Sequence, residues 1–75
     1  MKKYNYRYCV IMAENAGQMA YGIAIEQWQG TQWAVVRRIE NIASKEDIPA
    51  RLAASCTRLQ LDPIHILDVI LDTIP

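Results

Sequence analysis

The sequence has little of what usually marks a specialised function. It contains only two cysteines, Cys9 and Cys56, and its eight basic residues are balanced by eight acidic ones. Its longest apolar run, residues 19–25, is far too short to cross a bilayer. Neither a metal-ligand cluster nor a glycine-rich phosphate loop is present. These absences argue against a disulfide framework, a membrane partner and a strongly charged nucleic-acid binder.

The chain length indicates one small domain, residues 1–75. A chain of this size buries only about 60–65% of its unfolded surface, so it is marginally stable unless stapled or oligomeric. The basic first seven residues are not followed by the apolar stretch of a signal peptide. We therefore expect a cytoplasmic protein with reduced cysteines.

The first half of the chain has the alternating pattern of a β-hairpin. Residues 4–14 and 19–27 place bulky side chains at every second position, as in strands with one buried face. Ala16-Gly17 between them can form a two-residue turn, because glycine takes positive φ without strain. The register set by this turn puts three facing pairs on one bulky face: Met12 and Tyr21, Val10 and Ile23, and Tyr8 and Ile25.

A third strand is expected over residues 33–40. An odd-numbered loop before it would add one alternating set to the bulky face: Trp33, Val35 and Ile39, with Arg37 near an edge. An even-numbered loop would add the other set instead: Ala34, Val36 and Arg38. We favour the odd loop because it buries Trp33 and Ile39.

The opposite face of the hairpin carries small, mostly apolar residues: Cys9, Ile11, Ala13, Ala20, Gly22 and Ala24. Gly22 lies in mid-strand, where it indicates a bulge or a close approach of other backbone. Two helices can cover only one face of a three-stranded sheet. A second copy of the chain is therefore the expected cover for the small-residue face.

Two helices are predicted for the second half. The first starts at Ser44 or Asp47, and Pro49 is better accommodated by the later start. Its predicted apolar stripe is Ile48, Leu52, Ser55, Cys56 and Leu59, with Arg51, Thr57 and Arg58 facing outward. The second helix begins with Asp62 as the cap and Pro63 at its first position.

The second helix is apolar around most of its circumference, so it should be buried on more than one side. Combining these elements, the sequence predicts an α+β fold, a three-stranded antiparallel β-meander followed by two α-helices (β-β-β-α-α). Both helices should lie on the bulky face that carries Val10, Ile23 and Ile25. The surplus apolar surface predicts a twofold homodimer or a protein partner.

One side of the last helix carries the best candidate functional residues. His65, Asp68 and Asp72 follow Asp62 at spacings of three and four, so they line up on one helix face. Such a set could ligate a divalent metal or act as an acid–base pair. The competing interpretation, which we favour, is a solvated stripe, with Asp62 serving only as a cap. We favour a structural or interface role for His65, without metal or other cofactor.

Two further chemical interpretations are open. Cys56 with His65 could form a thiol catalytic pair, although Cys56 lies on an apolar stripe where a thiol behaves as a small hydrophobe. Alternating tyrosines could form a stacking platform for single-stranded nucleic acid, with basic neighbours: Tyr4, Tyr6 and Tyr8, with Lys2, Lys3 and Arg7. The competing interpretation is an aromatic strand face packed on the helices.

Several segments together resemble a small bacterial domain family of unknown function: Tyr21-Gly22-Ile23, residues 39–44, Cys56 and residues 61–72. The family pattern is a Tyr-Gly-Ile strand, an Ile-Ser helix start and a closing Leu-x-Pro-x-His-Leu-x-Asp-Val helix. Ile66 stands where that pattern often has leucine, and the Val-Val-Arg-Arg strand and Pro49 lie outside it. The resemblance implies a cytoplasmic single-domain protein without an assigned activity, and points to His65 and Asp68.

Three functions therefore remain as expectations. The favoured one is a non-catalytic protein-interaction or homodimerisation domain. The second is nucleic-acid or regulatory ligand binding through the sheet. The third, a small metal-dependent or thiol enzyme, has the least support from the residues.

Overall fold

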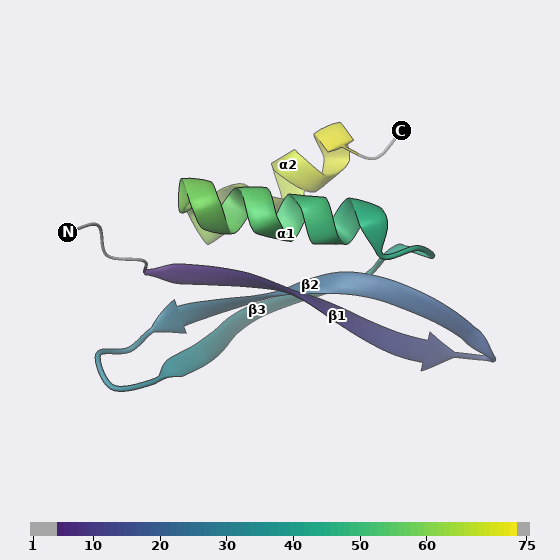
Figure 1. Ribbon diagram of the computed structural model, residues 1–75, viewed down its shortest axis with the longest axis horizontal. Coiled ribbons are helices and arrows are strands. Elements are labelled where there is room, and N and C mark those ends of the chain that lie inside the picture. Colours follow the sequence, from purple (N-terminus) through teal and green to yellow (C-terminus); the bar gives the residue numbers. More distant parts are fainter. Residues whose placement is uncertain (1–4, 74–75) are drawn as a thin grey trace.

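A computed structural model describes residues 5–73 as an antiparallel sheet with all its helices on one face (Figure 1). The strands are β1 (Tyr6–Asn15), β2 (Gln18–Trp28) and β3 (Trp33–Ala43), in the sheet order β1-β2-β3. The helices are α1 (Asp47–Leu59), the short 3-10 helix η1 (Pro63–His65) and α2 (Ile66–Thr73). The predicted α+β fold, a meander followed by two helices, is confirmed.

The β1–β2 hairpin has the register that its turn predicts. Asn15 pairs with Gln18 across a two-residue turn, in which Ala16 has φ 52° and Gly17 has φ 79°. Positive φ at both positions suits the right-handed twist of the flanking strands. The three predicted facing pairs follow: Met12 with Tyr21, Val10 with Ile23, and Tyr8 with Ile25. The start of the first predicted strand, at Tyr4, lies outside the described residues.

The third strand is where the preferred prediction fails. Trp28 pairs with Trp33 across residues 29–32, so the loop has an even number of residues. The register then shifts between the pairs Ile25–Arg37 and Glu26–Val35, which leaves Val36 as an extra residue in β3. This bulge reverses the alternation, so Ile39 and Arg37 share the helix-covered face as predicted. Trp33 and Val35 lie on the opposite face, contrary to the odd-loop prediction.

A second irregularity surrounds Gly22. Between the pairs Tyr21–Ala43 and Ile23–Ile39, β3 advances four residues while β2 advances two. Asn41 in this stretch has φ 57°. A side-chain carbon at Gly22 would overlap the carbonyl oxygen of Ile39. The predicted close approach of backbone at this glycine is therefore present, together with a bulge.

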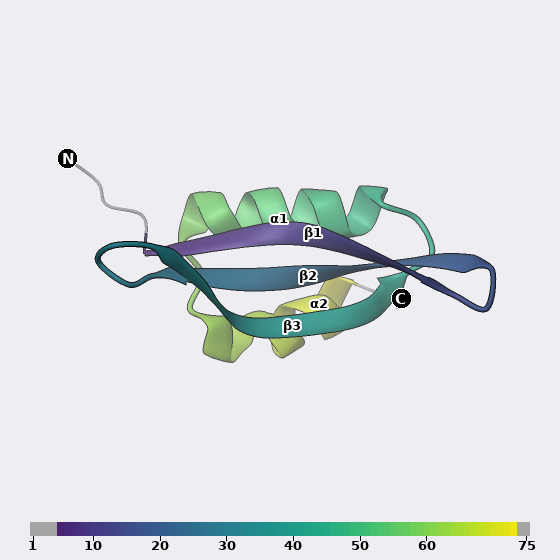
Figure 2. The ribbon, with the colours of Figure 1, turned by 90° about the horizontal axis from the view of Figure 1, so that it is seen from below.

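The core lies between the bulky face of the sheet and the two helices. It contains Tyr8, Ile23, Ile25, Leu52, Ala53, Cys56, Ile66 and Ile70. Seen from the strand side, α1 lies along β1 and α2 lies behind β3, so each helix covers a different part of the same face (Figure 2). The predicted placement of both helices on the face of Val10, Ile23 and Ile25 is confirmed.

Helix α1 differs from the prediction in the residues that it buries. In α1 the buried residues are Pro49, Leu52, Ala53 and Cys56. Leu59 was expected in the apolar stripe but is 67% exposed, because the helix presents Ala53 to the sheet instead. The cap at Asp62 is present: its side chain accepts a hydrogen bond from the Ile64 N–H at 3.1 Å, with Pro63 directly after it.

Candidate functional site

No element within residues 5–73 covers the sheet face opposite the helices, and this face carries the strongest candidate site. We call it the open face. Its residues come from all three strands: Arg7, Cys9, Ile11 and Ala13 of β1, Ala20, Gly22, Ala24, Glu26 and Trp28 of β2, and Trp33, Val35, Arg38 and Glu40 of β3. Trp28 is 39% exposed and Val35 is 54% exposed. Large apolar side chains at this exposure are typical of interaction surfaces when they adjoin one another.

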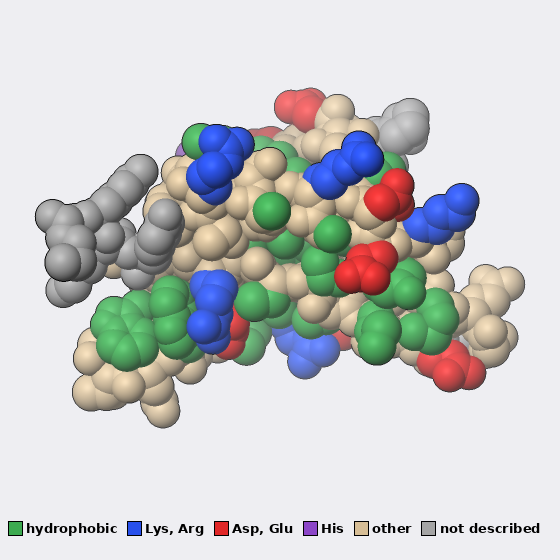
Figure 3. Space-filling view, viewed as in Figure 1, with side chains coloured by type: hydrophobic (Ala, Val, Ile, Leu, Met, Phe, Trp, Pro, Cys, Tyr) green, Lys and Arg blue, Asp and Glu red, His purple; other side chains and the backbone are tan. Residues whose placement is uncertain are grey.

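An aromatic cluster occupies the end of the open face near the β2–β3 turn. The rings of Trp28 and Trp33 meet edge to face, with centroids 5.5 Å apart. The Arg7 guanidinium lies 4.4 Å from the centroid of the Trp33 ring, a cation–π contact between β1 and β3. A space-filling view shows hydrophobic side chains gathered at this end of the molecule, at the lower left (Figure 3).

An ion pair fixes Arg7 above this cluster. Arg7 Nε donates to Glu26 Oε1 at 2.8 Å, across the paired strands β1 and β2. This hydrogen bond lowers the pKa of Glu26 and raises that of Arg7. Cys9 Sγ lies 3.4 Å from the same Glu26 oxygen, and desolvation raises the pKa of its thiol. Cys9 is therefore protonated near neutral pH and lacks the lowered pKa of a reactive thiol.

The middle of the open face is hollow, and β1 and β2 carry small side chains at the end near the β1–β2 turn. A shallow depression of about 260 Å³ is lined by Cys9, Ile11, Ala24, Glu26, Val35 and Arg38. Beyond it, towards the β1–β2 turn, lie Ala13, Ala20 and Gly22. The face thus has its tryptophans at one end, a hollow in the middle and, at the other end, small side chains on β1 and β2 beside Arg38 and Glu40 of β3.

The tyrosine platform expected from the sequence is not available as a binding surface. Tyr8 is 5% exposed beneath the helices, and its hydroxyl donates to the Leu61 carbonyl at 2.6 Å. Tyr6 lies on the same face and packs partly buried against the core. Tyr4, Lys2 and Lys3 lie outside the described residues. The competing interpretation, an aromatic strand face packed on the helices, holds for Tyr6 and Tyr8.

The thiol pair also lacks the environment that catalysis needs. Cys56 is buried in the core, and burial raises the pKa of its thiol. Both cysteines are free, and they lie on opposite faces of the sheet. A raised pKa keeps Cys56 protonated and poorly nucleophilic.

The acidic stripe with its histidine lies on the surface of η1 and α2. His65, Asp68 and Asp72 are all exposed, as is the capping residue Asp62. Among residues 5–73, no group of three or more histidine, cysteine, aspartate and glutamate side chains is placed to hold a metal ion. At His65 the backbone N–H closes the 3-10 turn by donating to the Asp62 carbonyl at 3.0 Å.

The last helix is buried on one side only. Ile66 and Ile70 point into the core, with Val69 packed partly buried against it. Ile64 and Leu71 are each 73% exposed, and Leu67 is 45% exposed. The expectation that this helix is buried on more than one side is not met within the described chain. Its outer side is a second apolar surface.

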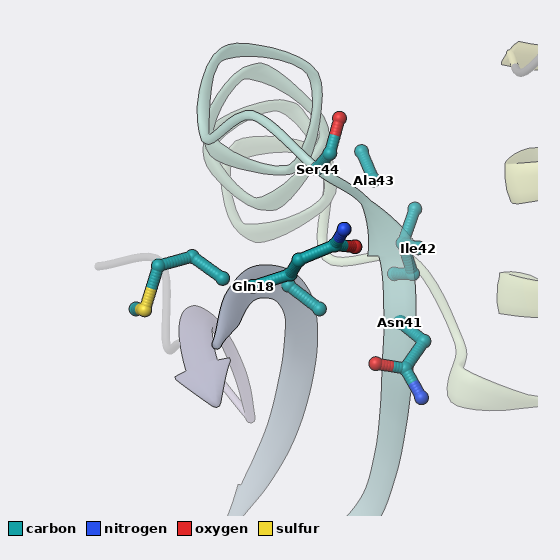
Figure 4. A pocket seen from close by; sticks show the side chains of 7 residues that line it. Gln18, Asn41, Ile42, Ala43 and Ser44 are labelled. Carbon is teal, nitrogen blue, oxygen red and sulfur yellow. The ribbon is translucent and has the colours of Figure 1, made fainter. Parts of the chain in front are cut away.

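The largest cavity of those described lies where β3 leaves the sheet. It measures about 360 Å³ and is lined by Gln18, Met19, Ala20, Asn41, Ile42, Ala43 and Ser44. Figure 4 shows the Gln18 and Asn41 amides reaching it from two strands. Its lining has amide and hydroxyl groups but no titratable side chain, so it offers no acid or base for catalysis.

The aromatic cluster was not found by sequence reasoning. The odd-loop preference assigned Trp33 to the core, and Trp28 was treated as part of a turn. The available signal was that four residues separate the two tryptophans, which allows them to face each other across a hairpin. Two further residues were missed. Thr57 was predicted to face outward and Gln60 was not singled out, whereas both hydrogen-bond to the backbone of β1.

Fold and site together define a small α+β domain with a one-sided helical cover and an apolar open face. The chain belongs to a family of unknown function, DUF6514, whose family model matches residues 1–75. This finding agrees with the resemblance to a small domain family of unknown function. No curated protein and no solved structure matches the chain. None of the helices within residues 5–73 has the length and apolar character needed to span a membrane.

Proposed function

We propose that this protein is a homodimerisation domain of the cytoplasm whose two copies pack through their open faces. The observation that carries the proposal is the exposed apolar surface of Trp28 and Val35, beside the partly buried Trp33, on a sheet face that no helix within residues 5–73 covers. Two free cysteines suit a reducing compartment.

The shape of the open face supports a second copy as the occupant. A twofold axis across the middle of the face reverses the strand direction, so each end meets the opposite end of the other copy. The Trp28–Trp33 end of one copy would then lie over Ala13, Ala20 and Gly22 of the other. Large side chains would fill space that small ones leave, as in packed sheet faces.

The charges of the open face are also compatible with self-association. Arg7 pairs with Glu26, and Arg38 Nη2 lies 3.7 Å from Glu40 Oε1. The face is therefore neutral overall, and two copies meet without net repulsion.

The size of the face predicts a weak dimer. Strands of ten and eleven residues rise about 3.4 Å per residue and lie about 4.8 Å apart, so the face covers roughly 500 Å². Two such faces bury about 1,000 Å², near the lower limit for a specific interface. We therefore expect dissociation in the micromolar range rather than an obligate dimer.

The two tryptophans make a native probe for this test, because they are the only ones in the chain. Sedimentation across a concentration series should move from the chain mass of 8.6 kDa to twice that mass, with a parallel blue shift of tryptophan emission. Val35→Lys should keep the protein monomeric, whereas the matched variant Leu71→Lys on the outer side of α2 should dimerise normally. A monomer at all concentrations would refute the proposal, and loss of the dimer only in Leu71→Lys would move the interface to α2.

A second candidate function is stacking of single-stranded nucleic acid on Trp28 and Trp33 beside Arg7. The contact of Arg7 with Trp33 favours it, since aromatic and basic side chains combine in such platforms. Titration with an oligothymidine should then quench tryptophan emission in a salt-dependent way. Quenching without any concentration-dependent mass change would favour this function over dimerisation.

A further inference from the structure

Along the outer edge of β1, which faces away from β2, the backbone groups of the first residues are hydrogen-bonded to side chains of α1 and its cap. The backbone groups farther along this edge have no such partner within the described residues. The Tyr8 N–H donates to Thr57 Oγ1 at 2.9 Å, and the Thr57 hydroxyl donates back to the Tyr8 carbonyl at 3.3 Å. Gln60 Oε1 accepts from the N–H groups of Asn5 at 2.7 Å and Tyr6 at 3.0 Å, and its Nε2 donates to the Tyr6 carbonyl at 2.9 Å. Two side chains of α1 and its cap thus substitute for a neighbouring strand.

These bonds establish which residues of β1 point their backbone N–H and C=O groups outward, away from β2. In an antiparallel strand, the N–H and C=O of one residue point to the same side, and the next residue points to the other. Since Tyr6 and Tyr8 bond to α1, the outward groups farther along are those of Val10, Met12 and Glu14. Within the described residues, no side chain donates to or accepts from these three backbone positions.

The wall beside this free edge is α1. Figure 2 shows α1 running along β1 and projecting past its outer edge. Ala54 and Ala50 lie three and seven residues before Thr57, so they occupy the same flank of the helix. Ala54 is exposed and Ala50 is partly buried. Small residues on this flank leave room for larger side chains beneath the helix.

We propose that the free edge of Val10, Met12 and Glu14 binds an extended segment of a partner protein as a fourth strand. Five residues of such a segment would face residues 10–14, and three of them would exchange backbone hydrogen bonds with β1. Side chains of those three would point towards α1, because paired residues share a face, so bulky apolar residues suit Ala50 and Ala54. This inference does not depend on the proposed dimer, which uses the open face.

A second copy of this chain does not fit the same edge. Neighbouring strands lie about 4.8 Å apart, whereas packed helices need about 8–10 Å between their axes. Symmetric pairing of two β1 strands would bring both α1 helices to one seam. A single extended segment has no helix of its own to collide there.

The probe that we choose is the peptide Lys-Val-Thr-Val-Thr-Val-Lys, acetylated and amidated at its ends. The backbone groups of its three valines can hydrogen-bond to β1, with the valine side chains under α1. The backbone groups of its two threonines point away from β1. Addition to labelled protein should shift the amide resonances of Val10, Met12 and Glu14 in a saturable manner. Methylation of the valine backbone nitrogens should weaken binding at least about tenfold, because it removes the bonding N–H groups. Methylation of the threonine nitrogens is the matched control and should leave binding nearly unchanged.

The protein side of the test uses proline at the same edge. Met12→Pro removes an N–H that faces away from β2, so the ladder to β2 keeps its bonds while strand addition is blocked. Met12→Ala keeps the N–H and should bind the probe as the parent does. Equal binding by both methylated peptides, absence of binding at millimolar probe, or shifts confined to Trp28 and Trp33 would overturn the proposal. If Met12→Pro fails to fold, the pair of methylated peptides still decides the question.

Discussion

On the face of the sheet under the helices, Ile23 and Ile25 are fully buried, whereas on the open face Val35 is 54% exposed and Trp28 is 39% exposed. The same three strands build both faces, and β2 contributes Ile to one and Gly or Ala to the other at alternate positions. The covered face is closed by α1 and α2 of the same chain. The comparison places the buried core on one face of the sheet, whereas large apolar side chains remain exposed on the other.

The sharpest way to break this comparison is to place a charge on each face. Ile23→Asp should abolish cooperative unfolding, because it removes a fully buried side chain and buries a carboxylate, a cost of about 4 kcal/mol or more. Val35→Asp should change the stability of the monomer by no more than about 0.5 kcal/mol. Urea unfolding at low protein concentration measures both. A stable Ile23→Asp protein would show that the core is assigned to the wrong face.

A second substitution tests the close approach of β2 and β3 at Gly22. Gly22→Ala should destabilise the domain by about 2 kcal/mol, because the methyl group would overlap the Ile39 carbonyl and force β3 to move. The matched control is Gly30→Ala, where nothing lies near the added carbon and only the φ of +92° opposes the change, for about 1 kcal/mol. Thermal melts of the two variants give the comparison. Equal losses would argue against the tight bulge.

A third substitution removes part of the link between α1 and the β1 edge. Thr57→Val should cost about 1–2 kcal/mol, since it leaves the Tyr8 N–H and carbonyl without their hydroxyl partner. Thr31→Val in the exposed β2–β3 turn serves as the control and should be nearly neutral. Hydrogen exchange of the Tyr8 amide provides a local readout. Unchanged protection of that amide in Thr57→Val would contradict the bonding described here.

The smallest expected effect is a loss of stability in alkaline solution. Desolvation raises the pKa values of Tyr8, Cys9 and Cys56 above their usual values in the folded state. The native protein therefore holds these protons more tightly than the unfolded chain does. The contribution of the two thiols to the free energy of unfolding should be fully present below their ordinary pKa of 9.0, and it should be lost as the pH rises above that value.

Melting temperatures measured from about pH 7 to about pH 10.5 test this direction. Cys56→Ala should flatten the alkaline decline, although it also changes the core packing, so the slope rather than the absolute melting temperature is compared. Iodoacetamide should modify Cys9 slowly in the folded protein and reach Cys56 only after unfolding. Rapid modification of Cys56 in the native state would show that the helices do not cover it.

The sequence by itself determined the order of the elements, the hairpin register and the identity of the covered face. These follow from local rules: the period-two alternation of β1 and β2, positive φ at Ala16-Gly17, and the cap of Asp62 before Pro63. The tertiary structure alone decided the side on which Trp33 and Val35 lie, because the bulge at Val36 arises from the pairing of β3 with β2. It also decided that Thr57 and Gln60 bond to β1 across more than forty residues of sequence. Alternation describes a strand only within itself, whereas register shifts and edge contacts depend on residues that are distant in the chain.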